Sequence, residues 1–318
     1  MSSVMSLVAR HSLFPVGNLL GPWLIGLVMS SIVFGITCLQ VYLYYTKFSS
    51  RDPIFLKSFV AVLMCLDIVH VTLLTMSYYG ATIDNFGDFQ QLVIAPWTLQ
   101  SQILVGVFLS TLVQWFYAYR IWTLANKSIW MPGLIIICSL SQLSFAIAYM
   151  VKALKFPAFK DSNVVLPYST SALSFETACN ILISGSMVYL LARNRVGFTK
   201  TNRAVNSLIA YMLNSGLLIM IFAISCLATF ITSTTTMVYG MFFFIDVRLY
   251  GCSFMSILNS RDSLREQLYA TNTDHAMVTI PTYGEGSSHG QHSEPTKRAE
   301  DSVIVWAKDR SEGTATVV

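Results

Sequence analysis

Residues 22–46 read PWLIGLVMSSIVFGITCLQVYLYYT and contain no charged side chain. A helix needs about 20 mostly apolar residues to cross the hydrocarbon core of a bilayer, so this stretch predicts a membrane span. Further apolar runs follow at 54–78, 98–121, 130–151, 171–192, 204–230 and 236–258. The pattern predicts an all-α protein, a seven-transmembrane-helix bundle over residues 22–258, preceded by an extracellular N-terminal segment at 1–21.

The composition favours a membrane environment. Of the 318 residues, 54% are hydrophobic and 11% are charged, whereas soluble domains carry roughly 25% charged residues. The cations lie mainly in the short gaps between apolar runs, which is where membrane proteins place their cytoplasmic anchors. We therefore expect the lipid bilayer of the plasma membrane or an endomembrane as the partner of this chain, and no nucleic acid.

The distribution of Lys and Arg between alternate gaps predicts the orientation. Lys47 and Arg51 lie in the first gap, and the gaps on the same side hold further cations at Lys127, Arg193, Arg195, Lys200 and Arg203. The gap at 79–97 holds no cation, although the stretch at 152–160 opposes the trend with three lysines. Because Lys and Arg gather on the cytoplasmic side, we expect the N-terminus outside and the C-terminus in the cytoplasm.

Proline positions agree with the predicted boundaries. Pro22, Pro53, Pro96, Pro132 and Pro167 all fall at or near the ends of predicted spans. A missing backbone N–H is least harmful at those ends, so we expect no proline inside a span.

The C-terminal part is predicted to lie outside the membrane. Residues 259–270 predict a short cytoplasmic helix, because Ser263 can cap it and Leu264 and Leu268 share one face. Residues 271–318 are polar, with Gly, Ser, Pro, Thr and mixed charge, and have too little apolar surface to offset the entropy lost on folding. This region is expected to be a disordered cytoplasmic tail.

Sequence motifs for catalysis are missing. The chain contains no P-loop, HExxH pair or protein-kinase signature, so we expect neither an enzyme nor a cofactor. His70 is the only one of five histidines inside a predicted span, so we expect no metal site. A retinal protein needs a lysine in its last span, where this chain has Arg248, whose guanidinium stays protonated and cannot form the imine.

Polar and ionisable side chains inside the predicted spans are the candidate functional residues. Ionisable groups are expensive to insert into a membrane and are candidates for that reason, although polar groups also clamp helices together. The candidates are Asp67, His70, Gln114, Glu176, Asn180, Asn206, Asn214, Asp246 and Arg248.

Depth in the membrane predicts a partner for Arg248. At about 1.5 Å per residue, Asp67 lies roughly 20 Å from the cytoplasmic end of its span and Arg248 roughly 15 Å from the end of its own. Asp246 is nearer along the chain, but residues two apart on a helix do not face each other, so it should point elsewhere, with Asn214 as a candidate partner. We expect an Asp67–Arg248 ion pair; the alternatives are an arginine that reaches the inner surface or binds backbone carbonyls.

Four stretches together resemble a known family. They are LLGPWLIGLVMSSIVFGITCLQVYLYY at 19–45, QWFYAYRIW at 114–122, VYLLARNRVGF at 188–198 and RLYGCSFMSILNSR at 248–261. They resemble a large fungal family of seven-span integral membrane proteins, best known from mushroom-forming fungi, that carry domain of unknown function 6534 in their last three spans. That family has Lys-Leu-Tyr-Ser-Asn where this chain has Arg248 and Gly251-Cys252, and Ser-Asp where it has Cys179-Asn180. The resemblance implies a fold and a membrane location, and supplies no activity.

Three classes of function stay open. A receptor-like signalling protein ranks first; it implies a small ligand or a cytoplasmic protein as partner and needs an outer cavity that reaches Glu176 or Asp67. A small-solute carrier or channel needs a polar path that joins Asp67, Asp246 and Asn214 to both faces. A membrane-structural or scaffold protein needs neither, and its buried polar groups would all be paired.

Overall fold

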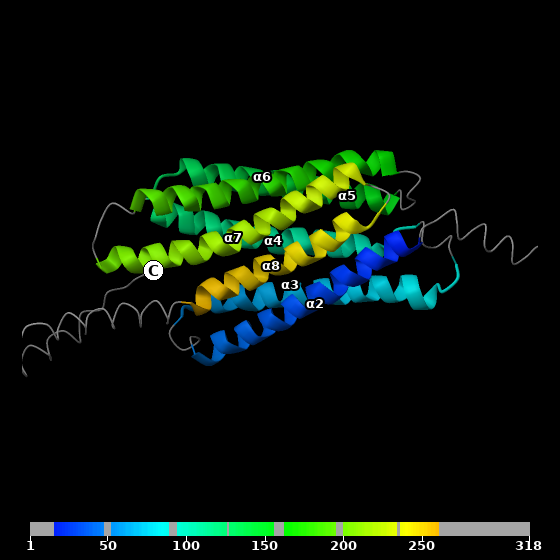
Figure 1. Ribbon diagram of the computed structural model, residues 1–318, viewed down its shortest axis with the longest axis horizontal. Coiled ribbons are helices and arrows are strands. Elements are labelled where there is room, and N and C mark those ends of the chain that lie inside the picture. Colours follow the sequence, from blue (N-terminus) through cyan, green and yellow to red (C-terminus); the bar gives the residue numbers. More distant parts are fainter. Residues whose placement is uncertain are drawn as a thin grey trace, which may run out of the picture. The chain divides into compact units, whose positions relative to one another are not determined.

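The computed structural model describes residues 16–47, 52–88, 94–125, 127–155, 162–194, 200–233 and 236–260, and within 200–215 it describes the backbone alone. In these ranges the chain forms seven α-helices and no β-strand (Figure 1). They are α2 (Val16–Lys47), α3 (Ile54–Tyr79), α4 (Trp97–Leu124), α5 (Trp130–Lys155), α6 (Ser162–Asn194), α7 (Lys200–Thr232) and α8 (Val238–Asn259). A π-helical turn, Gly80–Asp84, continues α3. The all-α prediction is confirmed for the described ranges. The predicted helix at 259–270 lies outside them apart from residues 259 and 260, and the predicted tail at 271–318 lies outside them entirely.

Six of the helices are long and apolar enough to cross a membrane. In α7 the part with described side chains, Gly216–Thr232, is apolar but shorter. Large apolar side chains face outward along these helices, for example Ile25 and Leu39 of α2 at 55% and 59% exposure and Ile137 of α5 at 62%. Soluble proteins rarely expose apolar surface of this extent, so the fold indicates a membrane protein.

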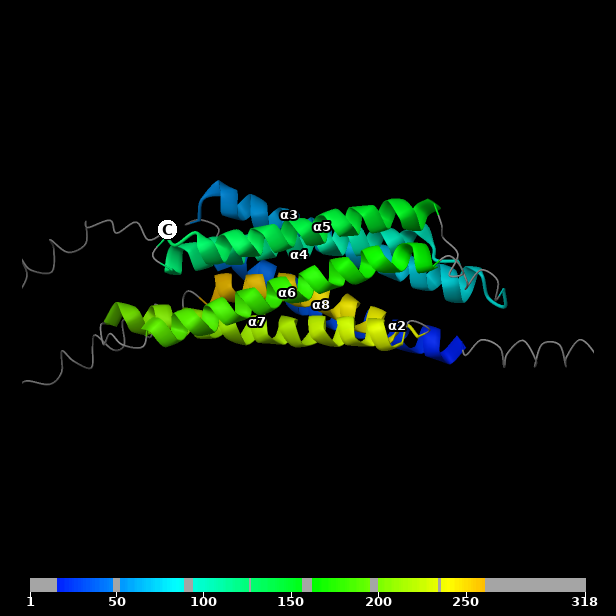
Figure 2. The ribbon, with the colours of Figure 1, turned by 90° about the horizontal axis from the view of Figure 1, so that it is seen from above.

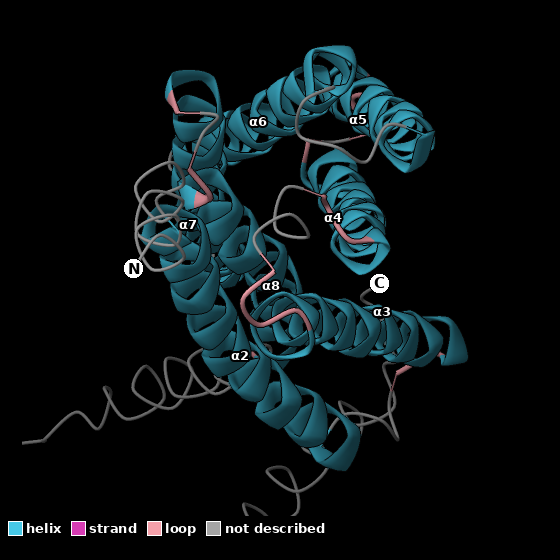
Figure 3. Cartoon of the chain, turned by 90° about the vertical axis from the view of Figure 1, so that its right-hand side faces the viewer, coloured by secondary structure: helices cyan, strands magenta, loops and turns pink. Residues whose placement is uncertain are grey.

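The helices run side by side and alternate in direction (Figure 2). We call the end at which α2, α4, α6 and α8 begin the upper end, and the opposite end the lower end. Viewed along the helices, α8 lies in the middle and packs against α2, α3, α4 and α7 (Figure 3). In its most apolar stretch 78% of the residues are buried within the protein, against 17% for α2. The charges of α8 are therefore placed among protein groups rather than lipid.

Helices α2 and α8 lie in close contact along their length. Gln40 donates to Ser256 Oγ at 3.2 Å, and Asn259 donates to the Gln40 carbonyl at 2.9 Å. Nearer the upper end, a Cβ on Gly26 would lie 2.9 Å from the Cα of Met241. Glycine at this position therefore lets the two backbones approach each other.

Two prolines lie inside helices, so the expectation of proline-free spans is wrong. Helix α2 begins at Val16 and contains Pro22, and α6 contains Pro167. Pro22 has no N–H for the carbonyl of Asn18, which would be its partner one turn earlier. The N–H of Met237 donates to that carbonyl instead, at 3.3 Å. A neighbouring segment thus satisfies the group that proline leaves open, which lets α2 start earlier than predicted.

The apolar interior differs between the two ends. The largest cluster of buried side chains, called the lower core, fills the lower half of the bundle between α3, α4, α6 and α8. In it Phe254 of α8 packs edge-on against Phe116 and Phe59, with ring centroids 4.7 and 5.2 Å away. Its members include Val113, Tyr117, Ile183, Met187, Leu190 and Phe254. A smaller cluster around Trp23, Leu99 and Phe244 lies at the upper end.

Candidate functional site

Arg248 is fully buried and ties three helices together. Its Nη1 donates to the carboxylate of Asp67 and, at 2.9 Å, to the Asp67 backbone carbonyl. Its Nε donates to Ser30 Oγ of α2 at 3.1 Å, and its Nη2 lies 2.5 Å from His70 Nδ1. The predicted Asp67–Arg248 ion pair is confirmed, and the alternative of a bond to a backbone carbonyl occurs as well. We call Ser30, Asp67, His70 and Arg248 the arginine cluster.

The arginine cluster has a defined arrangement of protons. A guanidinium has only donors, so His70 Nδ1 accepts from Arg248 and the proton of a neutral imidazole lies on Nε2. Asp67 and His70 are three residues apart on α3 and therefore share one helix face. The guanidinium carbon also lies 5.5 Å from the ring centre of Phe34, within range of a cation–π contact. The cluster is a charge-balanced clamp between α2, α3 and α8.

A second buried network centres on the hydroxyl of Tyr250. This hydroxyl donates to Asn180 Oδ1 at 2.9 Å and lies 3.4 Å from Glu176 Oε1. Gln114 Nε2 approaches it to 3.3 Å and also donates to Gln142 Oε1 at 3.1 Å. We call Gln114, Gln142, Glu176, Asn180 and Tyr250 the tyrosine network. It brings α4, α5, α6 and α8 together at mid-depth.

The remaining predicted candidates fall outside these two groups. Asp246 is buried on α8 and lies within electrostatic range of Glu176, and its Oδ1 has no hydrogen-bond partner among the described residues. Arg248 bonds Ser30, Asp67 and His70 rather than Asp246, as expected for residues two apart on one helix. The side chains of Asn206 and Asn214 lie outside the described residues, so the pairing expected between Asp246 and Asn214 stays a prediction.

Sequence reasoning missed several members of the site. Tyr250 and Gln142 belong to the tyrosine network, and Ser30 binds Arg248. Gln142 and Gln102 are amides in the middle of apolar runs, which is a signal that could have found them. Ser30 and Tyr250 carried no such signal, because serine and tyrosine are common in membrane helices and at their ends.

A cavity of about 130 Å³ extends from the upper end to the tyrosine network. It lies between α4, α5, α6, α7 and α8, and Gln102, Gln142 and Glu176 are polar groups in its wall. Most of its wall is apolar, including Val107, Ala146, Ala172, Phe230, Phe243 and Phe244. We call it the α4–α8 cavity. Its depth satisfies the expectation of a cavity that reaches Glu176.

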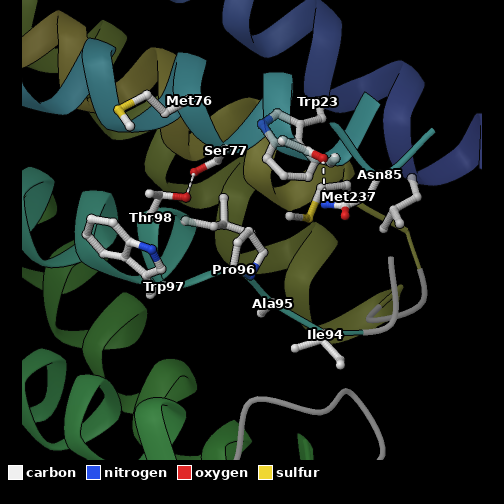
Figure 4. Close-up of a pocket in the computed structure, with 14 residues that line it drawn as sticks. Trp23, Met76, Ser77, Asn85, Ile94, Ala95, Pro96, Trp97, Thr98 and Met237 are labelled. Atoms are coloured by element: carbon white, nitrogen blue, oxygen red, sulfur yellow. Dashed lines mark hydrogen bonds between the residues drawn. The ribbon is translucent and has the colours of Figure 1, made fainter. Parts of the chain in front are cut away.

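A second cavity, of about 290 Å³, lies beside the first at the upper end (Figure 4). Trp23 of α2, Ser77 of α3 and Thr98 of α4 are among its lining residues, and Ser77 Oγ donates to Thr98 Oγ1 at 2.7 Å. Leu99 and Met237 line both cavities and stand between them. This cavity stays near the start of α4 and is lined by none of the predicted candidate residues.

Metal binding finds no support in the part of the chain that the structure describes, where no three His, Cys, Asp or Glu side chains are grouped suitably. The available groups are a clamped guanidinium, a buried carboxylic acid in a cavity wall, and amides. Groups of this kind can bind polar atoms by hydrogen bonds or charge.

Comparison with known proteins finds one family match, which covers the candidate residues of the last helices. Residues 176–263 match DUF6534, a family of unknown function. No curated protein and no solved structure shows significant similarity to this chain. The DUF6534 match begins at Glu176 and includes Asn180, Asp246, Arg248 and Tyr250. Together with the apolar helices, it indicates a membrane protein that contains a domain of unknown function.

Proposed function

We propose that this chain is a receptor-like seven-span membrane protein of the fungal kind that its sequence resembles. Its upper end faces outward, its N-terminus is outside and its C-terminus is cytoplasmic. A small ligand reaches the α4–α8 cavity from the outer side, and the bundle passes the signal to a cytoplasmic protein at the lower end. The proposal assigns no catalysis, cofactor or nucleic-acid binding to the chain.

The single observation that carries the proposal is that, among the described side chains, the lining of the cavity ends at mid-depth. It extends from the upper end to Glu176 and Gln142 at mid-depth. Beneath it, the Tyr250 hydroxyl closes the polar region by accepting from Gln114 and donating to Asn180. Below these lies the lower core, to which α6 and α8 contribute apolar side chains such as Met187 and Phe254, with Ser184 and Ser253 buried at similar depths. A closed lower half supports a ligand site rather than a conduit.

Unpaired polar atoms in the wall argue against a purely structural role. Both polar atoms of the Gln102 amide, in the cavity wall, are buried without a hydrogen-bond partner among the described residues. A buried polar group without a partner is unfavourable, and most such groups in folded proteins are satisfied. A scaffold protein has no reason to keep open polar positions around a cavity, whereas a ligand can fill them.

The charge distribution supports the orientation. Lys47 ends α2 and Arg193 lies in the last turn of α6, both at the lower end. The π-helical turn after α3 instead ends with Asp84 at the upper end. Lys152 and Lys155 in the last turn of α5 oppose this trend. The lower end carries the larger share of cations when the gaps are included, which supports a cytoplasmic lower end.

Thiol accessibility tests the blind cavity. Ser169 lines the α4–α8 cavity, and Ser184 lies about four turns further down the same helix, buried at 3% exposure. In a background with Cys226→Ser, because Cys226 also lines the cavity, we expect Ser169→Cys to react with a membrane-impermeant methanethiosulfonate added outside. Ser184→Cys is expected to react from neither side.

The same measurement separates the alternatives. A carrier or channel opens a path through the lower half, so Ser184→Cys would then react from one or both sides during turnover. Modification of Ser169→Cys from the cytoplasmic side alone would reverse the proposed orientation. The Cys226→Ser background without an added cysteine measures labelling of the other native thiols.

Glycosylation tests the orientation independently. Asn126-Lys127-Ser128 is the only Asn-x-Ser/Thr sequence in the chain and lies between α4 and α5, at the lower end. We expect it to carry no glycan in eukaryotic cells, because cytoplasmic loops do not meet the glycosylation machinery. Val4→Asn, which forms an acceptor sequence with Ser6, is expected to add a glycan that glycosidase removes. A glycan on Asn126 would show that the topology is opposite to the proposed one.

A further inference from the structure

Charges in the buried part of the bundle are unequal in number. Among the described residues, Asp67, Glu176, Asp246 and Arg248 are buried ionisable groups that are ionised at neutral pH in water. Arg248 forms its ion pair with Asp67. Glu176 is 3% exposed and its Oε1 lies 3.4 Å from the Tyr250 hydroxyl, and no described cation lies beside it. The interior therefore contains a carboxyl group without a counter-ion, set in the wall of the α4–α8 cavity.

Protein groups cannot relieve this imbalance within the described bundle. A buried carboxylate without a partner is strongly unfavourable, so it takes up a proton or meets a cation. Asp246 lies within electrostatic range of Glu176 and adds a second acidic group to the same region. A cation that enters the cavity would therefore be attracted to Glu176. In an apolar cavity this attraction is stronger than in water.

Gln102 gives an independent indication of a ligand. It is fully buried, lines the cavity, and neither its Nε2 nor its Oε1 has a hydrogen-bond partner among the described residues. It lies beside His70, whose Nε2 also lacks one. A hydrogen bond from His70 Nε2 to Gln102 Oε1 would still leave the Gln102 amide protons without an acceptor. Among the described residues, the wall thus presents a carboxyl group without a counter-ion on α6 and an amide whose Nε2 has no acceptor on α4.

The size and the lining of the α4–α8 cavity indicate what apolar group the ligand carries. An apolar cavity of roughly 150 Å³ in another protein accepts benzene, and the α4–α8 cavity has about 130 Å³. Phe230, Phe243 and Phe244 provide aromatic wall surface. We infer that the α4–α8 cavity binds a small, mainly apolar amine, with its ammonium group on Glu176 and its apolar body against the phenylalanines. This inference rests on the proposed ligand cavity and specifies its ligand class.

Two matched probes test the inference on the purified full-length protein in lipid nanodiscs. Benzylamine is protonated at neutral pH, and benzyl alcohol has nearly the same size and shape without the charge. We expect benzylamine to bind wild type at least about tenfold more tightly, because a hydrogen bond to a charged group contributes more than a neutral one. Binding is measured by isothermal titration calorimetry.

Two variants assign the preference to one residue. Glu176→Gln keeps the shape of the side chain, so it should lose the preference for the amine and keep the affinity for benzyl alcohol. Asp84→Asn removes a charge at the upper end that does not line the α4–α8 cavity, so it should keep the preference. If Glu176→Gln does not fold, protection of Ser169→Cys against the thiol reagent by each probe gives the same comparison in a chain that keeps Glu176.

The outcomes separate this inference from the proposed function. Equal affinity of wild type for both probes overturns the amine inference and leaves the ligand cavity in place. A preference that persists in Glu176→Gln removes Glu176 from the site, and binding of neither probe overturns the inference. Reaction of Ser184→Cys from both sides, with the amine preference intact, would instead overturn the receptor-like function alone.

Discussion

Arg248→Leu is expected to reduce the free energy of unfolding by about 3 to 5 kcal/mol, because it leaves the Asp67 carboxylate buried without its partner. Asp67 is 1% exposed and Arg248 is fully buried, so water cannot replace the lost contact. The double variant Arg248→Leu with Asp67→Leu removes both charges, and we expect it to be more stable than the single variant. Reversible unfolding of the purified protein in mixed micelles measures the difference.

A matched control separates charge pairing from the loss of a long side chain. Arg120 lies near the lower end of α4, partly exposed, with its guanidinium carbon 5.2 Å from the ring centre of Phe116. Arg120→Leu should change the stability by less than about 1 kcal/mol, as is usual for charges that remain solvated. If the double variant were no more stable than Arg248→Leu, the role of Asp67 as counter-ion would be wrong.

Gly26→Ala is expected to destabilise the bundle by about 1 to 3 kcal/mol, the usual range for overpacking a tight contact. The new Cβ would lie 2.9 Å from Met241 Cα and 3.0 Å from Phe244 Cδ2. A backbone atom cannot rotate away, so α2 and α8 would have to separate. This separation would also disturb Arg248, which reaches from α8 to Ser30, one turn below Gly26.

Gly35→Ala on the same helix provides the control. A Cβ at Gly35 meets no atom within 4 Å. Alanine is the better helix former by about 1 kcal/mol in water, so this variant should be neutral or more stable than wild type. The same unfolding measurement compares the two glycines, and equal effects would show that the α2–α8 contact is looser than described.

The positions of the helices could be predicted from the sequence because membrane insertion depends on length and apolarity, which are local properties. All seven helices overlap the predicted runs. The helix starts near Pro22 and Pro167 were predicted too late. There the start of the helix depends on whether another group can donate to the backbone carbonyl that proline leaves without a partner. For α2 that partner is the Met237 N–H, which is distant in sequence.

The Asp67–Arg248 pair was predictable for a related reason. A helix rises by a constant distance per residue, so position in the sequence determines depth in the membrane, and two opposite charges at equal depth are natural partners. Depth does not determine which helices are neighbours or how each is rotated. The sequence therefore left His70 and Ser30 unassigned as further partners of Arg248.

By itself, the sequence determined an all-α chain of apolar helices, their approximate bounds and the depth of each buried polar residue. Only the tertiary structure decided that α8 lies in the middle, that Tyr250 joins Glu176, Asn180 and Gln114, and that a cavity ends on them. The reason is physical: these features depend on helix rotation and on side chains that meet from four different helices. Packing between helices determines the rotation of each helix and the side chains that meet. The apolar pattern along a single helix contains little information about these two features.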